Sequence, residues 1–165
     1  MKEIKNITIR NKLQPGDLGY LIYLHGKLYK QEYNYGIQFE MYVAEGLQEF
    51  FKNCDLKKDR IWICEHEEKI IGSLLLMHRQ NTSAQLRYFL IAPEYRRLGL
   101  GKKLMQLFMD FFYECNYRSC YLWTTDELIS AASLYKRFGF ILSEEKMSSV
   151  FGKKVKEQRY NLKIK

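Results

Sequence analysis

The sequence predicts a single α/β domain built around one mixed sheet. Short apolar segments typical of strands alternate with longer segments in which apolar residues recur every three or four positions, as in amphipathic helices. Closely spaced strands predict antiparallel hairpins, whereas a helix between two strands permits a parallel pair. The chain has 165 residues, of which 47% are hydrophobic, and no visible repeat or linker. We therefore expect residues 1–165 to form one domain.

The first part of the chain is expected to supply four strands and two helices. A turn at 15–17 precedes the first helix, and Gly26 is expected to weaken or interrupt that helix. A charged turn between two apolar runs predicts a hairpin over residues 60–78. In chain order, the expected elements are a strand at 4–9, helices at 18–29 and 39–51, and strands at 60–65, 69–78 and 84–92.

The second part is expected to alternate helix and strand and to end in a hairpin. Thr125 or Asp126 is suited to cap the second of these helices, and Gly139 is suited to the position after its last residue, Phe138. The apolar residues of the last strand fit one face only partly. In chain order, the expected elements are a helix at 100–115, a strand at 119–124, a helix ending at 138, and strands at 140–150 and 155–164.

Composition narrows the classes of function. The formal charge of +8 suits a basic surface or an anionic ligand, but no nucleic-acid-binding motif is present, so we expect no nucleic-acid partner. The four cysteines and three histidines lack metal-binding spacing, so we expect no metal, and free thiols in a reducing cytoplasm. No apolar run approaches the ~18 residues that cross a bilayer, and no signal-peptide pattern begins the chain. We expect a cytoplasmic protein without membrane association.

The most informative segment, residues 90–104, predicts a binding site for a phosphate group. A buried strand leads into a basic turn that contains Gly99 and Gly101, and an amphipathic helix follows. Glycine lets the backbone approach a ligand, and a helix start offers unpaired N–H groups and a positive dipole end. A nucleotide P-loop is excluded because no serine or threonine follows Lys102. A dinucleotide-binding fingerprint is excluded because Leu104 stands where the motif requires its third glycine. An ordinary strand-to-helix loop is the alternative.

Two motifs together resemble the GNAT superfamily of N-acetyltransferases. Arg-x-x-Gly-x-Gly at 96–101, after a strand that ends in Ile-x-Pro at 91–93, resembles its acetyl-CoA-binding signature. The segment 131–140 resembles its downstream Ala-x-x-Leu-Tyr-x-x-x-Gly-Phe motif. The likeness is greatest to acetyltransferase domains fused to MarR-type regulators, supported by segments 16–19 and 122–126, although this sequence contains no recognisable DNA-binding domain.

The resemblance implies a mixed, mostly antiparallel sheet of six to seven strands with helices on both faces. It also implies direct transfer of an acetyl group from acetyl-CoA to a primary amine in a ternary complex. The turn would bind the pyrophosphate, and the open edge of the fourth strand, splayed from the fifth, would bind the pantetheine arm and stabilise the oxyanion. The residues expected to bind the cofactor are Phe89, Leu90, Ile91, Arg96, Arg97, Leu98, Gly99, Leu100, Gly101 and Lys102.

Tyr135 stands at the general-acid position that the resemblance implies. A tyrosine hydroxyl, with an ordinary pKa of about 10, keeps its proton at neutral pH and suits the protonation of a leaving thiolate. The alternative is a core aromatic, since Leu128, Ala131 and Phe138 lie at helical spacing from Tyr135. We expect Tyr135 to be the catalytic residue.

The proton acceptor for the amine is left open by the sequence. Gln85 stands where several members of the family carry a glutamate, and a glutamine does not accept a proton usefully. Glu32, Glu40 and a chain of water molecules are the candidates. Leu128 stands where many members have an asparagine that contacts the cofactor. These two departures support an alternative function, a non-catalytic acyl-CoA-binding or sensor domain.

No motif specifies the acceptor. We expect a small-molecule or peptide amine, bound by the first two helices and the final hairpin. Arg87 and Tyr88 are expected on opposite faces of their strand, and one of them would approach the acceptor. An arginine there would suit the carboxylate of an amino acid or peptide. The final hairpin is also the surface expected to form a homodimer.

Overall fold

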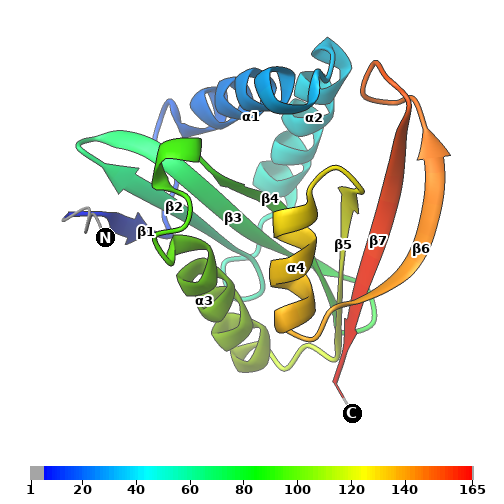
Figure 1. The fold of residues 1–165 in the computed structure, drawn as a ribbon. Coiled ribbons are helices and arrows are strands. Elements are labelled where there is room, and N and C mark those ends of the chain that lie inside the picture. The colour runs from blue at the N-terminus through cyan, green and yellow to red at the C-terminus, as the bar shows by residue number, and fades with distance from the viewer. Residues whose placement is uncertain (1–5, 165) are drawn as a thin grey trace.

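The computed structural model describes residues 6–164 as one seven-stranded sheet flanked by helices (Figure 1). The strands are β1 (Thr8–Arg10), β2 (Arg60–His66), β3 (Lys69–Arg79), β4 (Ser83–Ile91), β5 (Ser119–Thr125), β6 (Ile141–Ser148) and β7 (Val155–Lys163). The α-helices are α1 (Asp17–Tyr33), α2 (Ile37–Asn53), α3 (Leu100–Glu114) and α4 (Ile129–Arg137). The sheet order is β1-β2-β3-β4-β5-β7-β6, and every neighbouring pair is antiparallel except β4 with β5. The mixed, mostly antiparallel sheet predicted from the sequence is confirmed.

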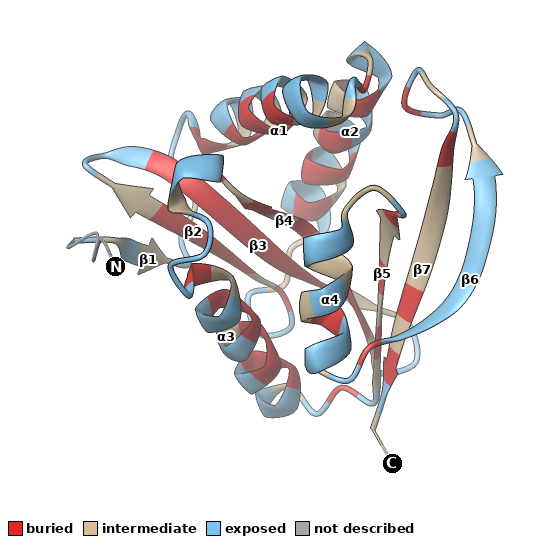
Figure 2. Cartoon of the chain, in the orientation of Figure 1, coloured by how far each residue is buried: buried red, intermediate tan, exposed pale blue. Residues whose placement is uncertain are grey.

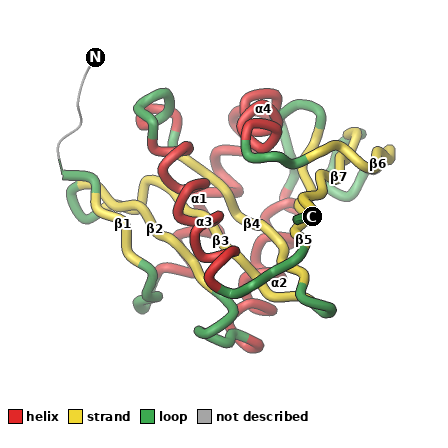
Figure 3. The backbone as a smooth tube through the Cα atoms, turned by 90° about the horizontal axis from the view of Figure 1, so that it is seen from below, coloured by secondary structure: helices red, strands yellow, loops and turns green. Residues whose placement is uncertain are grey.

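The helices cover both faces of the sheet, as predicted. α1 and α2 pack on one face, around fully buried residues such as Leu21 and Val43. α3 and α4 pack on the other face, where Leu104, Phe108 and Phe112 are fully buried. Figure 3 shows α2 and α4 on opposite sides of the sheet, and Figure 2 shows buried central strands beside an exposed β6. The sheet therefore separates two hydrophobic cores.

The one parallel pair, β4 with β5, is short and opens along its length. Only residues 83–85 of β4 pair with residues 119–121 of β5. Beyond this point β4 pairs only with β3, and β5 pairs only with β7. The edge of β4 that faces β5 is therefore unpaired over residues 86–91. This is the splayed edge that the family resemblance implied.

A bulge in β4 changes which side chains face α2. The pairing of β4 with β3 shifts by one residue, so Tyr88 and Phe89 share one opposing position. Tyr88 takes a φ of 50°, and Ser73 Oγ donates a hydrogen bond to the Tyr88 carbonyl at 2.7 Å. Arg87 and Tyr88 both lie against Gly46 of α2, where a Cβ atom would collide with both. The expectation that Arg87 and Tyr88 point to opposite faces is wrong, because Tyr88 is part of the bulge, which interrupts the alternation of side chains directly after Arg87.

Gly26 does not interrupt α1. The helix is continuous from Asp17 to Tyr33, and a Cβ atom on Gly26 would lie 2.5 Å from Oε2 of Glu40. The absence of a side chain thus lets the carboxylate of Glu40, on α2, lie directly against α1. The predicted interruption at Gly26 is therefore wrong, and the glycine instead allows a close contact between the two helices.

The start of α4 also differs from the prediction. Leu128 precedes the helix without a side-chain cap, so neither Thr125 nor Asp126 caps it. The Thr125 hydroxyl is instead hydrogen-bonded to the Tyr35 hydroxyl at 2.7 Å. The predicted role of Gly139 after the helix is confirmed by its φ of 88°.

The first strand differs in its bounds from the prediction, and the last strand explains the partial apolar pattern noted in the sequence. β1 overlaps only the end of the segment predicted at 4–9, and residues 4–5 of that prediction lie outside the described residues. In β7, Val155 belongs to the core beneath α1 and α2, whereas Tyr160 and Leu162 belong to the core beneath α3 and α4. The apolar residues of this strand fit one face only partly because β7 contributes to both cores.

Candidate active site

The turn between β4 and α3 presents a row of unpaired backbone N–H groups. A short 3-10 helix (Pro93–Tyr95) leads into it, and Arg97 and Gly99 take left-handed conformations with φ of 63° and 82°. Within the described residues, Lys103 is the first residue after Arg96 whose N–H reaches a backbone carbonyl, that of Gly99 at 3.0 Å. The N–H groups of residues 97–102 and the positive end of the α3 dipole therefore form a site suited to a phosphate or pyrophosphate.

The two glycines of this turn have different physical roles. Gly99 has a positive φ and no atom within 4 Å of the place where a Cβ would stand, so its backbone conformation is what requires glycine. Gly101 lies close to the neighbouring elements, since a Cβ there would be 3.3 Å from Leu134 of α4 and 3.4 Å from Ile91 of β4. Gly101 thus allows α3 to begin directly against α4 and the open edge of β4.

A cleft of about 540 Å³ runs from this turn along the open edge of β4. α1 lines one side of it, and the loop before α4 together with α4 lines the other. Of the residues predicted to bind the cofactor, the cleft is lined by Phe89, Leu90, Ile91, Arg96, Arg97 and Gly101. Leu98, Gly99 and Lys102 lie exposed in the adjoining turn, and Leu100 is buried in the core, so Leu100 offers only its backbone.

Arg96 is engaged by protein groups instead of being free for a ligand. Its two Nη atoms donate to the carboxylate of Glu32 at 2.7 and 2.8 Å, and its Nε donates to the carbonyl of Ile91 at 2.8 Å. Donation of these hydrogen bonds to the Glu32 carboxylate raises the pKa of the Arg96 guanidinium. Among the described residues, Arg97 and Lys102 form no ion pair, so these two side chains are the free positive charges of the turn.

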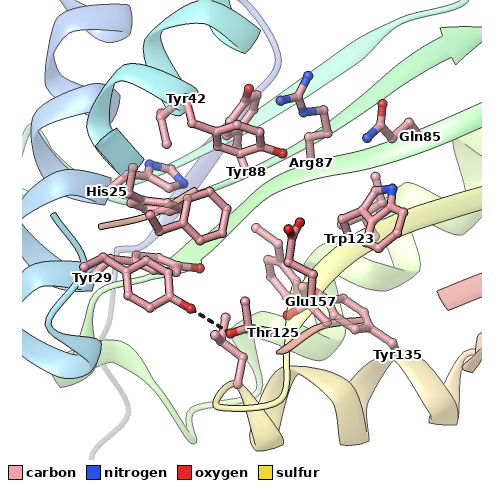
Figure 4. A pocket seen from close by; sticks show the side chains of 18 residues that line it. His25, Tyr29, Tyr42, Gln85, Arg87, Tyr88, Trp123, Thr125, Tyr135 and Glu157 are labelled. Atoms are coloured by element: carbon pink, nitrogen blue, oxygen red, sulfur yellow. Dashed lines mark hydrogen bonds between the residues drawn. The ribbon is translucent and has the colours of Figure 1, made fainter. Parts of the chain in front are cut away.

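A smaller pocket of about 90 Å³ adjoins the cleft (Figure 4). Tyr29, Phe89 and Leu128 line both spaces. The walls of the pocket come from α1, α2, β4, β5, α4 and the β6–β7 hairpin. Of these, α1, α2 and the hairpin are the elements from which the sequence led us to expect the acceptor site. Half of the 18 residues that line it are Phe, Tyr or Trp, namely Tyr29, Tyr35, Phe39, Tyr42, Tyr88, Phe89, Trp123, Tyr135 and Phe151.

Hydrogen bonds between loops hold this pocket together. The Tyr35 hydroxyl joins the α1–α2 turn to Thr125 at the end of β5, with an O–O distance of 2.7 Å. The N–H of Gly36 donates to the carbonyl of Phe151, in the β6–β7 hairpin, at 2.8 Å. Lys153 of the same hairpin bonds to the end of α1 and to the loop before α4. Segments far apart in the chain therefore form one wall.

Tyr135 lies where the cleft and the smaller pocket meet. Its side chain is 4% exposed and lines the smaller pocket, and its ring centroid is 6.1 Å from that of Phe89, which lines both spaces. Burial raises the pKa of the Tyr135 hydroxyl above its ordinary value, so the group carries its proton at neutral pH. A protonated hydroxyl in this position suits a proton donor.

The structure brings neither candidate glutamate to the smaller pocket. Glu32 lines the cofactor cleft and is paired with Arg96. Glu40 lies against Gly26, between α1 and α2. Gln85 does line the pocket, and its Oε1 accepts hydrogen bonds from Arg79 and Tyr121 side chains.

Glu157 is the one carboxylate among the described residues that lines the smaller pocket. It projects from β7, and Figure 4 places its carboxylate between Arg87 and Tyr135. Its position follows from that of Val155, two residues earlier, which packs into the core beneath α1 and α2. The sequence analysis did not identify Glu157, although this two-residue spacing was an available signal.

His25 contributes an unpaired nitrogen to the same pocket. Its ring is 2% exposed, and Nδ1 lies 2.8 Å from the carbonyl oxygen of Leu21. Because a carbonyl only accepts, the proton of the neutral ring lies on Nδ1, and Nε2 has no partner among the described residues. Burial lowers the pKa of His25 to about 4, so the ring is neutral at pH 7. An isolated histidine on an apolar helix face gave no sign of this role.

Metal-binding clusters and membrane-spanning helices are two features that the described residues do not contain. No group of three or more His, Cys, Asp or Glu side chains in residues 6–164 is arranged to hold a metal ion. No helix in this part of the chain is long and apolar enough to cross a bilayer. The four cysteines are all free thiols.

A family assignment follows from comparison with known proteins. Residues 27–140, which include the unpaired edge of β4, the N–H turn and Tyr135, match the model of the acetyltransferase (GNAT) family. The chain belongs to this family. Membership of this family confirms the resemblance that the two motifs carry. The narrower likeness to domains fused to MarR-type regulators stays a prediction.

Relatives with curated descriptions align with about half of this chain. The chain is 32% identical over 82 residues to the uncharacterized N-acetyltransferase YjgM of Escherichia coli, which covers 48% of this chain and 49% of that protein. It is 29% identical over 84 residues to human N-acetyltransferase 8, which covers 48% of this chain and 37% of that protein. The aligned part is thus less than half of either relative.

Solved structures match the fold over nearly the whole chain. An acetyltransferase of the GNAT family from Staphylococcus aureus has a TM-score of 0.77 and 24% identity, with 97% of this chain and 100% of that chain covered. A spermidine N-acetyltransferase from Vibrio cholerae, in complex with CoA and spermine, has a TM-score of 0.70 and 23% identity, with 95% of each chain covered. At these identities the likeness supports the GNAT fold.

Proposed function

We propose that residues 1–165 form an N-acetyltransferase domain that transfers the acetyl group of acetyl-CoA directly to a primary amine. The observation that carries this proposal is the unpaired edge of β4, which joins the N–H turn at one end to Tyr135 and the aromatic pocket at the other. The donor and acceptor of one reaction would thus meet at Phe89. The bound CoA of the Vibrio cholerae enzyme is consistent with this arrangement.

The cofactor would bind along the cleft. Its pyrophosphate would accept hydrogen bonds from the N–H groups of residues 97–102, with Arg97 and Lys102 adding charge. Its pantetheine arm would pair with the open edge of β4 at residues 89–91, as an added strand does. This direction delivers the thioester to the end of the cleft where Tyr135 lies.

The chemistry would proceed by attack of a neutral amine on the thioester. The nitrogen lone pair forms a bond to the acetyl carbon, and the carbonyl oxygen takes up negative charge beside a backbone N–H of β4. The carbon–sulfur bond then breaks, and the leaving thiolate takes the proton of Tyr135. Glu157 would accept the proton that the amine loses, directly or through water.

Two further features belong to the proposal. The exposed β6 at the edge of the sheet would pair with a second copy of the chain to form a homodimer, which analytical ultracentrifugation tests directly. The free thiols support a cytoplasmic location.

Two measurements test the function. Acetyl-CoA should raise the melting temperature, because it binds only the folded state. Thiol release should follow when acetyl-CoA is mixed with a panel of amines, amino acids, polyamines and peptides. Binding without transfer to any amine would favour the non-catalytic acyl-CoA sensor, to which the departures at Gln85 and Leu128 point. Absence of binding at millimolar acetyl-CoA would overturn the cofactor assignment itself.

A further inference from the structure

We propose that the amine acceptor also carries a carboxylate, bound by Arg87, so that the substrate class is a free amino acid or another small amino carboxylate. The inference rests on the proposed function and specifies its acceptor. It comes from the distribution of charge and hydrogen-bond donors at the end of the pocket where β4 meets α2.

Two guanidinium groups share one carboxylate at this end of the pocket. Glu49 of α2 accepts from Arg79 through Oε1 at 2.8 Å and from Arg87 through Oε2 at 3.2 Å. Gln85, which carries no charge, accepts from Nε and Nη2 of Arg79 at 3.0 and 2.7 Å. No second carboxylate of the described residues pairs with either arginine. One positive charge is therefore uncompensated.

Arg87 is the arginine with donors to spare. Arg79 uses Nε and both Nη atoms on its neighbours, whereas Arg87 makes a single hydrogen bond among the described residues, through Nη1 to Glu49. A guanidinium has five N–H donors, so the N–H groups of Nε and Nη2 of Arg87 are free to bind a ligand. The Arg87 side chain is only 10% exposed and lies over the rings of Tyr42 and Tyr88. A ligand carboxylate would supply the missing acceptors in the planar geometry that a guanidinium favours.

Strand alternation places Arg87 on the same side of the sheet as Gln85, and both residues line the smaller pocket. The bulge after Arg87 adds Tyr88 to the same side. Figure 4 shows the Arg87 side chain on β4 and the Glu157 carboxylate on the opposite side of the same space. No ion pair joins Arg87 to Glu157, so both charges are available to a ligand between them.

This pair of charges fits a zwitterion better than a simple amine. An ammonium group would lie near Glu157, beside Tyr135, and a carboxylate near Arg87. A polyamine, which carries only positive charges, would be repelled by the excess positive charge of Arg79 and Arg87, which share Glu49. The aromatic walls between the two charges suit an apolar or aromatic side chain on the ligand.

The test compares each amino acid with the amine that lacks only its carboxylate, such as phenylalanine with phenethylamine and lysine with cadaverine. The wild type should have the lower KM for the amino acid in at least one pair. Arg87→Gln should raise that KM about tenfold or more and leave the KM for the matched amine unchanged. Arg87→Lys should raise the KM for the amino acid less than Arg87→Gln does, because lysine keeps the positive charge but lacks the paired N–H donors of the guanidinium.

Two further variants keep the test decisive. Gln85→Glu leaves Arg87 intact but compensates its charge, so it should also raise the KM for the amino acid selectively. Arg118→Gln removes an exposed arginine elsewhere and should leave every KM unchanged. Equal effects of Arg87→Gln on both members of a pair, or failure of amino acids to stabilise the CoA-bound protein against heat, would overturn the inference. Transfer to amines alone would overturn it and leave the proposed function intact.

Discussion

Glu32 and Arg96 form a bidentate ion pair that joins α1 to the N–H turn at the cofactor cleft, with N–O distances of 2.7 and 2.8 Å. The pair places a carboxylate beside a site built for a polyanion. Arg96 is held a second time by the carbonyl of Ile91, so its position does not depend on Glu32 alone. The carboxylate therefore opposes binding more than it organises the turn.

Glu32→Gln should tighten the binding of CoA. The change removes a negative charge from the cleft and frees the Arg96 guanidinium for the phosphates, so we expect a roughly three- to tenfold lower Kd. Calorimetric titration at low and high salt measures it, and the gain should shrink as salt screens the charges. Glu45→Gln, an exposed position on α2, makes the same charge change elsewhere and should have no effect. Weaker binding by Glu32→Gln would mean that the ion pair positions Arg96 for the cofactor.

Tyr135→Phe should lower kcat by about a hundredfold or more, the usual contribution of a general acid. The variant keeps the ring that packs near Phe89 and Phe140, so folding and acetyl-CoA affinity should change little. Thiol-release kinetics and the acetyl-CoA-induced shift in melting temperature separate the two effects. Unchanged turnover would remove Tyr135 from the reaction and leave it as a core aromatic.

Gly99→Glu should abolish acetyl-CoA binding because it puts a negative side chain into the N–H turn. Gly16 supplies a matched control: like Gly99 it precedes a helix, has a positive φ, and has no atom within 4 Å of a Cβ. Gly16→Glu therefore carries a similar backbone strain, about 1 kcal/mol, without entering the cleft. Without acetyl-CoA, both variants should melt at a lower temperature than the wild type. Acetyl-CoA should raise the melting temperature of Gly16→Glu but not that of Gly99→Glu. Equal responses would place the cofactor elsewhere.

The cofactor half of the site could be predicted from the sequence because its determinants are local. The strand, the turn with Gly99 and Gly101, and the helix after it are consecutive in the chain, and Tyr135 stands within a second contiguous motif. The physical demands there, a positive φ and free N–H groups, select residue types at fixed spacing. The turn residues therefore appeared as a pattern before the fold was known.

The acceptor half could not be predicted in the same way because it is assembled across the sheet. Arg87 and Tyr88 face the pocket together only because of a one-residue bulge, which the alternation of β4 does not reveal. Glu157 reaches the same space from β7, seventy positions later, because the parallel and antiparallel pairing of β5 brings that strand alongside. Neither relation is encoded in neighbouring residues.

Glu157→Gln should lower kcat/KM by about a hundredfold and weaken its dependence on pH, because the variant removes the proton acceptor and keeps the shape. Glu144→Gln is the matched control, since Glu144 is exposed on the neighbouring β6. Initial rates of thiol release from pH 6 to 9 make the comparison. A wild-type pH profile in Glu157→Gln would assign the proton transfer to water.

His25 should make the folded state less stable in mild acid. Burial lowers its pKa to about 4 in the folded protein, against about 6.5 when unfolded. Between these values the unfolded chain takes up a proton that the folded chain does not, so the free energy of unfolding falls as pH falls from 6.5 to 4. One pKa unit corresponds to about 1.4 kcal/mol, so the loss from pH 7 to pH 5 should be about 2 kcal/mol.

His25→Leu isolates this effect, because it removes the titrating group and keeps an apolar side chain on α1. Urea unfolding at pH 7 and pH 5 gives the drop in stability for each protein. The drop in wild type should exceed that in His25→Leu by about 2 kcal/mol, while His66→Leu, a partly buried control, should keep most of the wild-type drop. Equal drops in wild type and His25→Leu would mean that His25 gains a proton in the folded state. The ring would then be positively charged, and Nε2 would donate a hydrogen bond into the smaller pocket instead of being an unpaired hydrogen-bond acceptor.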